Sequence, residues 1–475
     1  MIPPKNACVA LLVALLCAVP LWGCLPFQRL GMEKVHHDSA LRESRNPVIF
    51  LHGFMGSKLH NARTHRSVWG RVRNLFWRGK EDHLALPIDQ TPLSANRDEL
   101  VAHEICDSVG GIDFYGPIVR ALRDIAGYDI GNIDHPHPGE TLYVFAYDWR
   151  RDNVESARAL GEAIDRIVAA HGRPDLKIDL VAHSMGGMVA RYYVTYGGED
   201  VLDQSPLPAP TYAGARHVGK VILIGTPIEG SFTAFRIMHL GITRSLSPEA
   251  LFTMPSVFQL FPSREARPFV DTNGETLPVG LYEPDNWVRY GWSVFQPHIL
   301  AALRHELPRR ERKSAEAFHK LRQRMRDFLA AALERGDAFH RALAQADPHQ
   351  APVRYYAFGS DCIPTQTRAV LHQKDGTWKL AFSSDDLLVG IGHTERLRDL
   401  LFSPGDGTVS LASLLAQDPT IPKAFEPSIS FASTVFLCEA HGFLTRNPIF
   451  QNNLFHVLAS EPGPSGERPR PLAAR

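Results

Sequence analysis

Apolar runs alternate with amphipathic stretches through the first half of the chain. Residues 154–171 place apolar side chains at helical spacing, and Gly172 follows as a stop. Four apolar runs, bounded by glycine or polar residues, have the length of buried strands: 47–51, 141–146, 177–183 and 220–227. Strands that alternate with helices predict an α/β fold, with a mostly parallel central sheet covered by helices on both faces.

This pattern breaks in the second half. Residues 231–350 hold loops rich in proline and aromatic residues, followed by a charged amphipathic helix or helix pair at about 308–346. The strand pattern resumes at 353–360 and again at 428–438. We therefore interpret 231–350 as a cap inserted into one large domain, residues 46–460, and we find no internal repeat.

A second insertion is predicted at about 57–106, where no regular alternation is seen. Residues 62–80 interleave six basic side chains with Trp69, Phe76 and Trp77. Such a mixture suits a lipid–water interface, so we interpret the segment as a small lid and Trp69 as a candidate substrate-binding residue. A solvated loop with a few buried aromatic residues is the alternative.

The N-terminus has the features of an export signal. Lys5 is the only charge in residues 1–23, and a short apolar run follows it. The segment that ends at Cys24 resembles a bacterial lipobox, except that Trp22 stands where a small residue is usual. We predict lipidation of Cys24 and a place in the bacterial cell envelope. An ordinary cleaved signal and a retained anchor are the alternatives.

Two further segments flank the domain. Residues 24–45 are polar and are predicted to be a tether, whereas residues 461–475 are predicted to be a disordered tail. The 475-residue chain carries 51 basic and 51 acidic residues, so it has no general electrostatic attraction to nucleic acid. We therefore expect no nucleic-acid partner.

The strongest chemical signal lies between an apolar strand and a helix, in Ala182-His183-Ser184-Met185-Gly186-Gly187. This is the setting of a nucleophile elbow, where small residues on either side of Ser184 allow a sharp turn. We predict that Ser184 is the nucleophile. The side chain of His183 should point away from that of Ser184, so we interpret it as structural.

A serine nucleophile needs a base and a group that orients the base. Asp406 lies between Gly405 and Gly407 late in the chain, and His441 follows the last predicted strand. The order Ser, acid, His is that of α/β-hydrolases, so we predict Asp406 as the acid and His441 as the base. Other candidates for the acid are Asp361, Asp385 and Asp386. His456 lies in a helical pattern and is interpreted as a packed helix residue.

An oxyanion hole needs two backbone donors. The amide of Met185 is one candidate, because it follows the nucleophile at the start of a helix. The loop after the first strand should supply the other. We favour the Phe54 amide, with Met55 as the second choice.

Several of these motifs together resemble the lecithin–cholesterol acyltransferase family of α/β-hydrolases. They are HGFMGSKL, AYDWR, AHSMGGMVARYY, GTPIEGS, GDGTVS and EAHGFLTRNPIF, and they span roughly residues 47–460. The resemblance implies an α/β-hydrolase core, a cap, a lid near the oxyanion loop, and a Ser184–Asp406–His441 triad acting on ester-linked acyl chains.

The AYDWR motif has two interpretations. A strand end that carries Asp148, Trp149 and Arg150 can support the wall of a site by packing and ion pairing. Trp149 is also a candidate substrate-binding residue. No phosphate-binding glycine loop is present, and His135 and His137 lie in a proline-stiffened turn with no second ligand cluster. We therefore expect neither a cofactor nor a metal.

Six cysteines are too few for a disulfide scaffold. Once the signal is removed and Cys24 is acylated, Cys106, Cys362 and Cys438 remain. Cys362 and Cys438 each follow a predicted strand, and whether they pair stays open.

Three functions compete at this stage. The first is a serine-dependent lipid acyl hydrolase or O-acyltransferase that acts on lipid or phospholipid and meets the membrane through its anchor and lid. The second is a carboxylesterase for non-lipid esters, which the large cap and basic–aromatic lid disfavour. The third is a catalytically silent surface lipoprotein.

Overall fold

The computed structural model describes residues 45–71, 84–109, 112–243, 246–346, 351–383, 386, 397–417 and 428–460. The chain divides into two units, residues 1–43 and 44–475, and every element below belongs to the second. The predicted signal, the lipidation site at Cys24, nearly all of the tether and the predicted tail lie outside the described residues.

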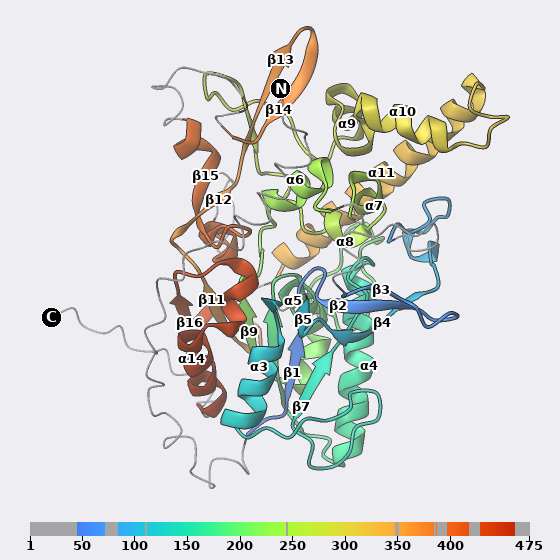
Figure 1. The fold of residues 1–475 in the computed structure, drawn as a ribbon. Helices are drawn as coiled ribbons and strands as arrows, with labels where there is room; N and C mark the ends of the chain where they lie inside the picture. Colours follow the sequence, from blue (N-terminus) through green and yellow to red (C-terminus); the bar gives the residue numbers. More distant parts are fainter. Residues whose placement is uncertain are drawn as a thin grey trace, which may run out of the picture. The chain divides into compact units, whose positions relative to one another are not determined.

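Six parallel strands form the central sheet (Figure 1). Its order is β16 (Phe431–Phe436), β11 (Arg354–Gly359), β9 (Val218–Ile224), β8 (Ile178–His183), β1 (Val48–Leu51) and β7 (Leu142–Phe145). Every residue of β1 and β8 is buried. Burial on both faces explains why these strands appear as continuous apolar runs in the sequence.

Helices cover both faces of the sheet. Because successive strand residues point to opposite faces, β1 contributes to two cores. Val48 and Phe50 pack with residues of α3 (Gly116–Arg120) and α14 (Pro448–Ala459). Ile49 and Leu51 pack with residues of α4 (Asn153–His171) and α5 (Met185–Tyr196). The predicted fold class, a mostly parallel sheet between helices, is confirmed.

Helix α4 illustrates how local sequence fixes an element. The Asp152 side chain accepts a hydrogen bond from the backbone N–H of Val154, which caps the start of the helix. Gly172 follows its last residue in the left-handed region, at φ 61°. Both ends agree with the predicted span of 154–171 to within a residue.

The cap between β9 and β11 is built mainly from helices (Figure 1). They are α6 (Phe232–Leu240), α7 (Pro248–Phe252), α8 (Pro255–Phe258), α9 (Pro284–Tyr290), α10 (Pro297–Glu306) and α11 (Ala315–Ala344). Aromatic rings of Phe235, Phe261, Trp287 and Trp292 contact one another in its interior. The predicted charged helix corresponds to α11, and the aromatic loops before it contain the shorter helices.

Small sheets complete the described structure, and one occupies a region where the sequence shows no alternation. Strands β2 (Ser57–Asn61), β3 (Ser67–Trp69) and β4 (Leu100–Ile105) form an antiparallel sheet in the predicted lid. Register shifts interrupt both of its pairings, which breaks the period of two that sequence analysis relies on. Residues 72–83, which carry much of the basic–aromatic patch, are outside the described residues.

The remaining described elements are short. They are β5 (Ser108–Val109), β6 (Ile112–Asp113), β10 (Phe269–Val270), β12 (Ile363–Gln366), β13 (Ala369–Lys374), β14 (Thr377–Ala381), β15 (Phe402–Gly405), α13 (Leu411–Leu414) and the turns η3 (Leu93–Ala95), η4 (Ala121–Ile125), η5 (Ala213–His217), η6 (Ser293–Phe295) and η8 (His441–Arg446). Within the described residues, no helix is long and apolar enough to cross a membrane.

Candidate active site

Ser184 occupies a sharp turn at the carboxyl end of β8. Its backbone lies at φ 54°, a region that non-glycine residues rarely adopt, and α5 begins at the next residue. The two glycines that follow make room for this turn. A Cβ on Gly186 would collide with the carbonyl oxygen of His52, and a Cβ on Gly187 would collide with the Thr226 side chain. The turn therefore presents the Ser184 hydroxyl at the edge of the sheet, as the motif predicts.

Three side chains from distant parts of the chain meet at this turn. Ser184 Oγ lies 2.9 Å from His441 Nε2, and His441 Nδ1 lies 2.7 Å from Asp406 Oδ2. The strands β8 and β16 end at the same edge of the parallel sheet, which brings the serine and the histidine together. Ser184 is 8% exposed, so the hydroxyl is shielded but reachable.

Asp406 is held as a carboxylate by its surroundings. Its Oδ1 accepts hydrogen bonds from the backbone N–H groups of Thr408 (2.9 Å) and Val409 (2.7 Å). Burial acts to raise its pKa, but the charge and hydrogen bond of His441, together with these two amides, hold the pKa below its usual 3.8. The arrangement leaves Asp406 Oδ2 free to accept the Nδ1–H of His441.

The other acidic candidates lie elsewhere. Asp361 is exposed, and the Asp386 carboxylate accepts hydrogen bonds from the backbone N–H groups of Phe382 and Ser383. Asp385 is outside the described residues. His456 lies on α14 but is exposed, so its interpretation as a packed helix residue is wrong.

The loop after β1 passes directly over the serine. A Cβ on Gly53 would lie 2.7 Å from the Ser184 Cβ, so only glycine permits this approach. The next residue, Phe54, is partly exposed and stacks edge-on against Trp149, while Met55 adopts φ 64°. The predicted donors thus lie on segments that border Ser184: Phe54 on this loop, and Met185 at the start of α5.

The His52 side chain fixes the conformation of this loop. Its ring stacks on Tyr147 with centroids 4.1 Å apart. One ring nitrogen lies 2.7 Å from the Gly53 carbonyl oxygen, and the other accepts the Tyr147 backbone N–H. Burial lowers the pKa of His52 to about 4, so the ring is neutral and can make both contacts at once.

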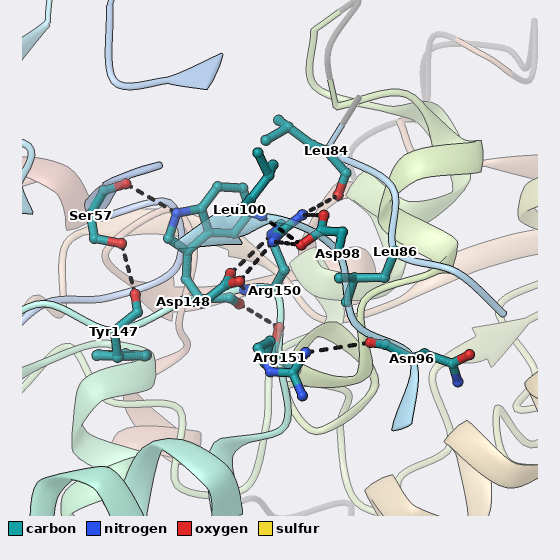
Figure 2. A network of polar contacts seen from close by, with 12 residues as sticks. Ser57, Leu84, Leu86, Asn96, Asp98, Leu100, Tyr147, Asp148, Arg150 and Arg151 are labelled. Carbon is teal, nitrogen blue, oxygen red and sulfur yellow. Dashed lines mark hydrogen bonds and ion pairs between the residues drawn. The ribbon is translucent and has the colours of Figure 1, made fainter. Parts of the chain in front are cut away.

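Figure 2 shows a polar network at the end of β7 that explains the AYDWR motif. The Arg150 guanidinium is fully buried and forms ion pairs with Asp98 (2.6 Å) and Asp148 (2.7 Å). It also donates a hydrogen bond to the Leu84 carbonyl oxygen. The network ties the lid segment to the main sheet, which agrees with the supporting role that ion pairing suggested.

Trp149 has no surface for a substrate in this structure, because it is 0% exposed. Its indole N–H donates to the Ser57 carbonyl oxygen, and its ring contacts Phe54 and Trp69. The prediction of substrate contact at Trp149 is therefore wrong for this structure. The residue packs against the loop that follows β1.

Trp69 is also nearly buried, at 7% exposed. Its indole N–H donates to the Met55 carbonyl oxygen over 3.1 Å. The residue thus joins strand β3 of the lid to the loop that borders Ser184. Its described contacts are those of a support, and they do not match the substrate contact that we predicted.

Sequence analysis missed a chain of hydrogen bonds that links the backbone of Gly53 to the backbone of His441. The Gly53 N–H donates to the Tyr115 hydroxyl (2.9 Å), which lies 2.8 Å from His183 Nδ1. His183 Nε2 lies 3.0 Å from the carbonyl oxygen of His441. Burial lowers the pKa of His183 to about 3, so its neutral ring accepts at Nδ1 and donates at Nε2. No motif around Tyr115 signals this contact.

A disulfide joins Cys362 to Cys438 and resolves the pairing that the sequence left open. Cys362 follows β11, and Cys438 lies three residues before His441. The bond therefore braces the loop that carries the histidine. Cys106 is buried and free, and its burial raises the pKa of the thiol to about 12.

In the part of the chain that the structure describes, no group of three or more His, Cys, Asp or Glu side chains is arranged to hold a metal ion. The arrangement at Ser184 instead provides a hydroxyl, an imidazole and a carboxylate in sequence, with two backbone segments beside the hydroxyl. Such a set can remove a proton from a serine and stabilise a negative oxygen next to it.

A family of known proteins matches this chain in the region that holds the turn at Ser184. Residues 136–266 match the model of the lecithin:cholesterol acyltransferase family. The stretch includes β7, the AYDWR motif, Ser184 and the first cap helices, so the resemblance carried by the sequence motifs is confirmed there. The match supports a hydrolase or acyltransferase acting on lipid esters as the general class of the protein.

Individual relatives are more distant. The uncharacterized protein YJR098C of Saccharomyces cerevisiae is 26% identical over 167 residues, which is 35% of this chain and 23% of that protein. The solved Tle4–Tli4 complex contains a chain that is 15% identical, with a TM-score of 0.55 over 87% of this chain and 98% of its own length. The mature lipase BlEst2 of Bacillus licheniformis is 11% identical, with a TM-score of 0.33 over 88% of this chain and 93% of its own. The likeness to the Tle4–Tli4 structure shows the fold.

Proposed function

We propose that the protein is a serine-dependent lipid acyl hydrolase or O-acyltransferase, with Ser184, His441 and Asp406 as its catalytic residues. The observation that carries the proposal is the unbroken chain of contacts from the serine hydroxyl to the buried carboxylate, 2.9 Å and 2.7 Å long. The match of residues 136–266 to the lecithin:cholesterol acyltransferase family supports lipid esters as the substrate class.

In the first step, Ser184 Oγ attacks the carbonyl carbon of an acyl ester while His441 Nε2 takes the hydroxyl proton. Asp406 accepts the Nδ1–H of His441 and stabilises the imidazolium that forms. The tetrahedral intermediate carries its negative charge on the former carbonyl oxygen. It collapses by breaking the bond to the alcohol oxygen, which leaves with the proton that His441 returns.

Two backbone amides are assigned to the negative oxygen. Met185 N–H lies at the first residue of α5, where the helix dipole adds positive potential, and Phe54 N–H lies on the loop packed against Ser184. Neither donor depends on its own side chain. The surrounding contacts of His52, Trp69 and Trp149 fix the backbone that presents the Phe54 amide.

The second half of the reaction resolves the acyl-enzyme. Water gives hydrolysis, whereas a lipid alcohol held beside the acyl group gives transfer, and His441 acts as the base in either case. Product analysis by mass spectrometry with mixed phospholipids, triacylglycerol and a sterol acceptor separates the two outcomes. Turnover of short soluble esters alone, with no lipid product, would replace this proposal by a non-lipid carboxylesterase.

The direct test replaces the nucleophile. Ser184→Ala should lower turnover by at least about 10³-fold and abolish labelling by a fluorophosphonate probe, because the attacking oxygen is gone. Ser205→Ala removes a hydroxyl from an exposed residue and serves as the control. Substantial turnover by correctly folded Ser184→Ala protein would sink the assignment.

We further propose that the protein is exported and anchored in the bacterial cell envelope through an acyl group on Cys24. The Cys362–Cys438 disulfide supports an oxidising compartment, where such bonds persist. Metabolic labelling with a fatty-acid analogue should mark the wild-type protein and not the Cys24→Ser variant. Equal labelling of both would rule out this anchor.

A further inference from the structure

A groove of about 740 Å³ lies between helix α6 and the β13–β14 hairpin. Its walls carry Arg236 from the helix and His372, Lys374 and Lys379 from the hairpin. Leu240, at the end of α6, also lines it. The groove therefore combines several basic side chains with aliphatic and aromatic ones.

The hairpin register places its basic residues on one side. His372 pairs directly with Lys379, and Lys374 lies two residues beyond His372, so their side chains share a face. The ring of Trp378 points to the opposite face, where it contacts Tyr290 of the cap. One face of the hairpin thus packs on the cap, and the basic face is turned to the groove.

These cations are not held in ion pairs among the described residues. Arg236, Lys374 and Lys379 are exposed, and none of them forms an ion pair within the part of the chain that the structure describes. Asp386 also lines the groove, but its carboxylate is occupied by two backbone N–H groups. Asp375 lies at the tip of the hairpin and is exposed. The three cations outnumber these two acids.

Exposed aliphatic side chains stand beside the cations. Leu240 is 52% exposed and Ile242 is 41% exposed, at and just beyond the end of α6. They are two of the five large apolar side chains that are open to solvent among the described residues: Val101, Ile130, Leu240, Ile242 and Ile449.

This surface has a fixed position relative to the candidate active site. The groove reaches Gly407, the residue after Asp406. Helix α6 is also anchored there, because the Ser231 hydroxyl at its N-terminus donates to the Thr408 carbonyl oxygen. Figure 1 shows the hairpin projecting past the cap, on the side of the molecule beyond the carboxyl ends of the strands.

We propose that Arg236, Lys374, Lys379, Leu240 and Ile242 form a docking surface for an anionic phospholipid bilayer. The cations meet the phosphates of the head groups, and the two aliphatic side chains enter the boundary between head groups and acyl chains. A bilayer fits these observations better than a soluble anion does, because a soluble anion would not cover Leu240 and Ile242. Docking here would hold the groove, which reaches Gly407 beside Asp406, against the lipid.

The first test measures binding without catalysis or an acyl anchor. The full chain carrying Ser184→Ala and Cys24→Ser is sedimented with vesicles of phosphatidylglycerol and phosphatidylcholine, and with vesicles of phosphatidylcholine alone. Binding should favour the anionic vesicles and weaken with salt. Adding Arg236→Gln, Lys374→Gln and Lys379→Gln should weaken binding by roughly 10- to 100-fold.

A matched variant loses the same charge elsewhere. Arg166→Gln, Arg173→Gln and Lys177→Gln remove three exposed cations near the end of α4, at the amino edge of the sheet. This control should bind as the parent does. Equal binding by the groove variant and the parent, or an equal loss in the control, would overturn the proposal.

The contribution of Leu240 and Ile242 to vesicle binding is tested separately. Leu240→Ser with Ile242→Ser should reduce the vesicle binding that remains at high salt, since the insertion of apolar side chains does not depend on charge.

The proposal does not require Ser184 chemistry. In the otherwise wild-type chain, the groove variant should therefore keep its turnover of a soluble monomeric ester and lose turnover of vesicle lipid. Unchanged turnover of vesicle lipid would contradict the docking surface without touching the catalytic assignment.

Discussion

At the scale of single residues, the candidate site depends on groups that do not react. His183 and Tyr115 connect the backbone of Gly53, beside the serine, to the backbone of His441. Both side chains are buried, so their hydrogen bonds compete with no water. The position of the loop that carries His441 is thereby coupled to that of the Gly53 loop.

Tyr115→Phe should lower kcat by roughly 10- to 100-fold and leave KM nearly unchanged, because the loops shift relative to the acyl group. The rate of fluorophosphonate labelling should fall in parallel. Tyr282→Phe is the matched control, since the buried Tyr282 hydroxyl has no hydrogen-bond partner among the residues that the structure describes. A Tyr115→Phe kcat equal to that of the control would exclude the positioning role.

At the scale of elements, the guanidinium of Arg150 connects the end of β7 to the lid segment. Arg150 bridges Asp148 at the strand end and Asp98 in the lid segment, and its own guanidinium is fully buried, whereas the Asp148 and Asp98 side chains are 11% and 21% exposed. Removing one partner of a buried ion pair leaves the other charges without compensation. This bridge therefore fixes where the lid begins.

Arg150→Met should reduce the free energy of unfolding by about 3 to 5 kcal/mol, because it strands two carboxylates. Urea titration followed by tryptophan fluorescence measures the change. Arg97→Met breaks the pair with Glu155, in which the arginine side chain is 65% exposed, and should cost less than about 1 kcal/mol. Similar decreases in the free energy of unfolding for the two variants would show that burial of the ion pair does not decide the size of the decrease.

At the scale of the whole molecule, several histidines are buried in the neutral form. Burial lowers the pKa of His52, His239 and His340 to about 4 and that of His183 to about 3. In the unfolded chain these rings would titrate near 6.5. The unfolded state therefore binds more protons below that pH, and stability is lost as the pH falls from 6.5 to 4.

The free energy of unfolding should consequently fall as the pH drops through this range, by about 3 kcal/mol for each histidine with a pKa near 4, and the melting temperature should fall with it. The stability difference between wild type and His52→Asn should shrink on acidification. The exposed His456 provides the control, and His456→Asn should follow the wild-type pH dependence. A melting temperature that does not change between pH 6.5 and 4 would contradict this account.

Across the whole molecule, part of the fold and part of the candidate site could be predicted from the sequence. The central strands, α4 and the turn at Ser184 follow from local patterns: continuous burial, helical spacing and small residues around one serine. Asp406 followed from its flanking glycines and the chain order, and His441 from its place after the last predicted strand. In the structure, His441 contacts Ser184, and Asp406 contacts His441.

Other features depend on contacts between distant segments. Register shifts hide the lid strands from a search for alternation. Trp149 belongs to a motif that suggests chemistry, but burial gives it a supporting role. Tyr115 reaches His183 across 68 residues of sequence, and no local pattern reports such a contact.

The backbone of Ser184 has one further consequence. Its positive φ of 54° costs a side-chain-bearing residue on the order of 1 to 3 kcal/mol, whereas glycine adopts it freely. A selection that rewarded only resistance to heat would thus tend to exchange the hydroxymethyl side chain of Ser184 for a hydrogen atom. In this protein, thermal stability would favour glycine at position 184, whereas the proposed chemistry requires serine there.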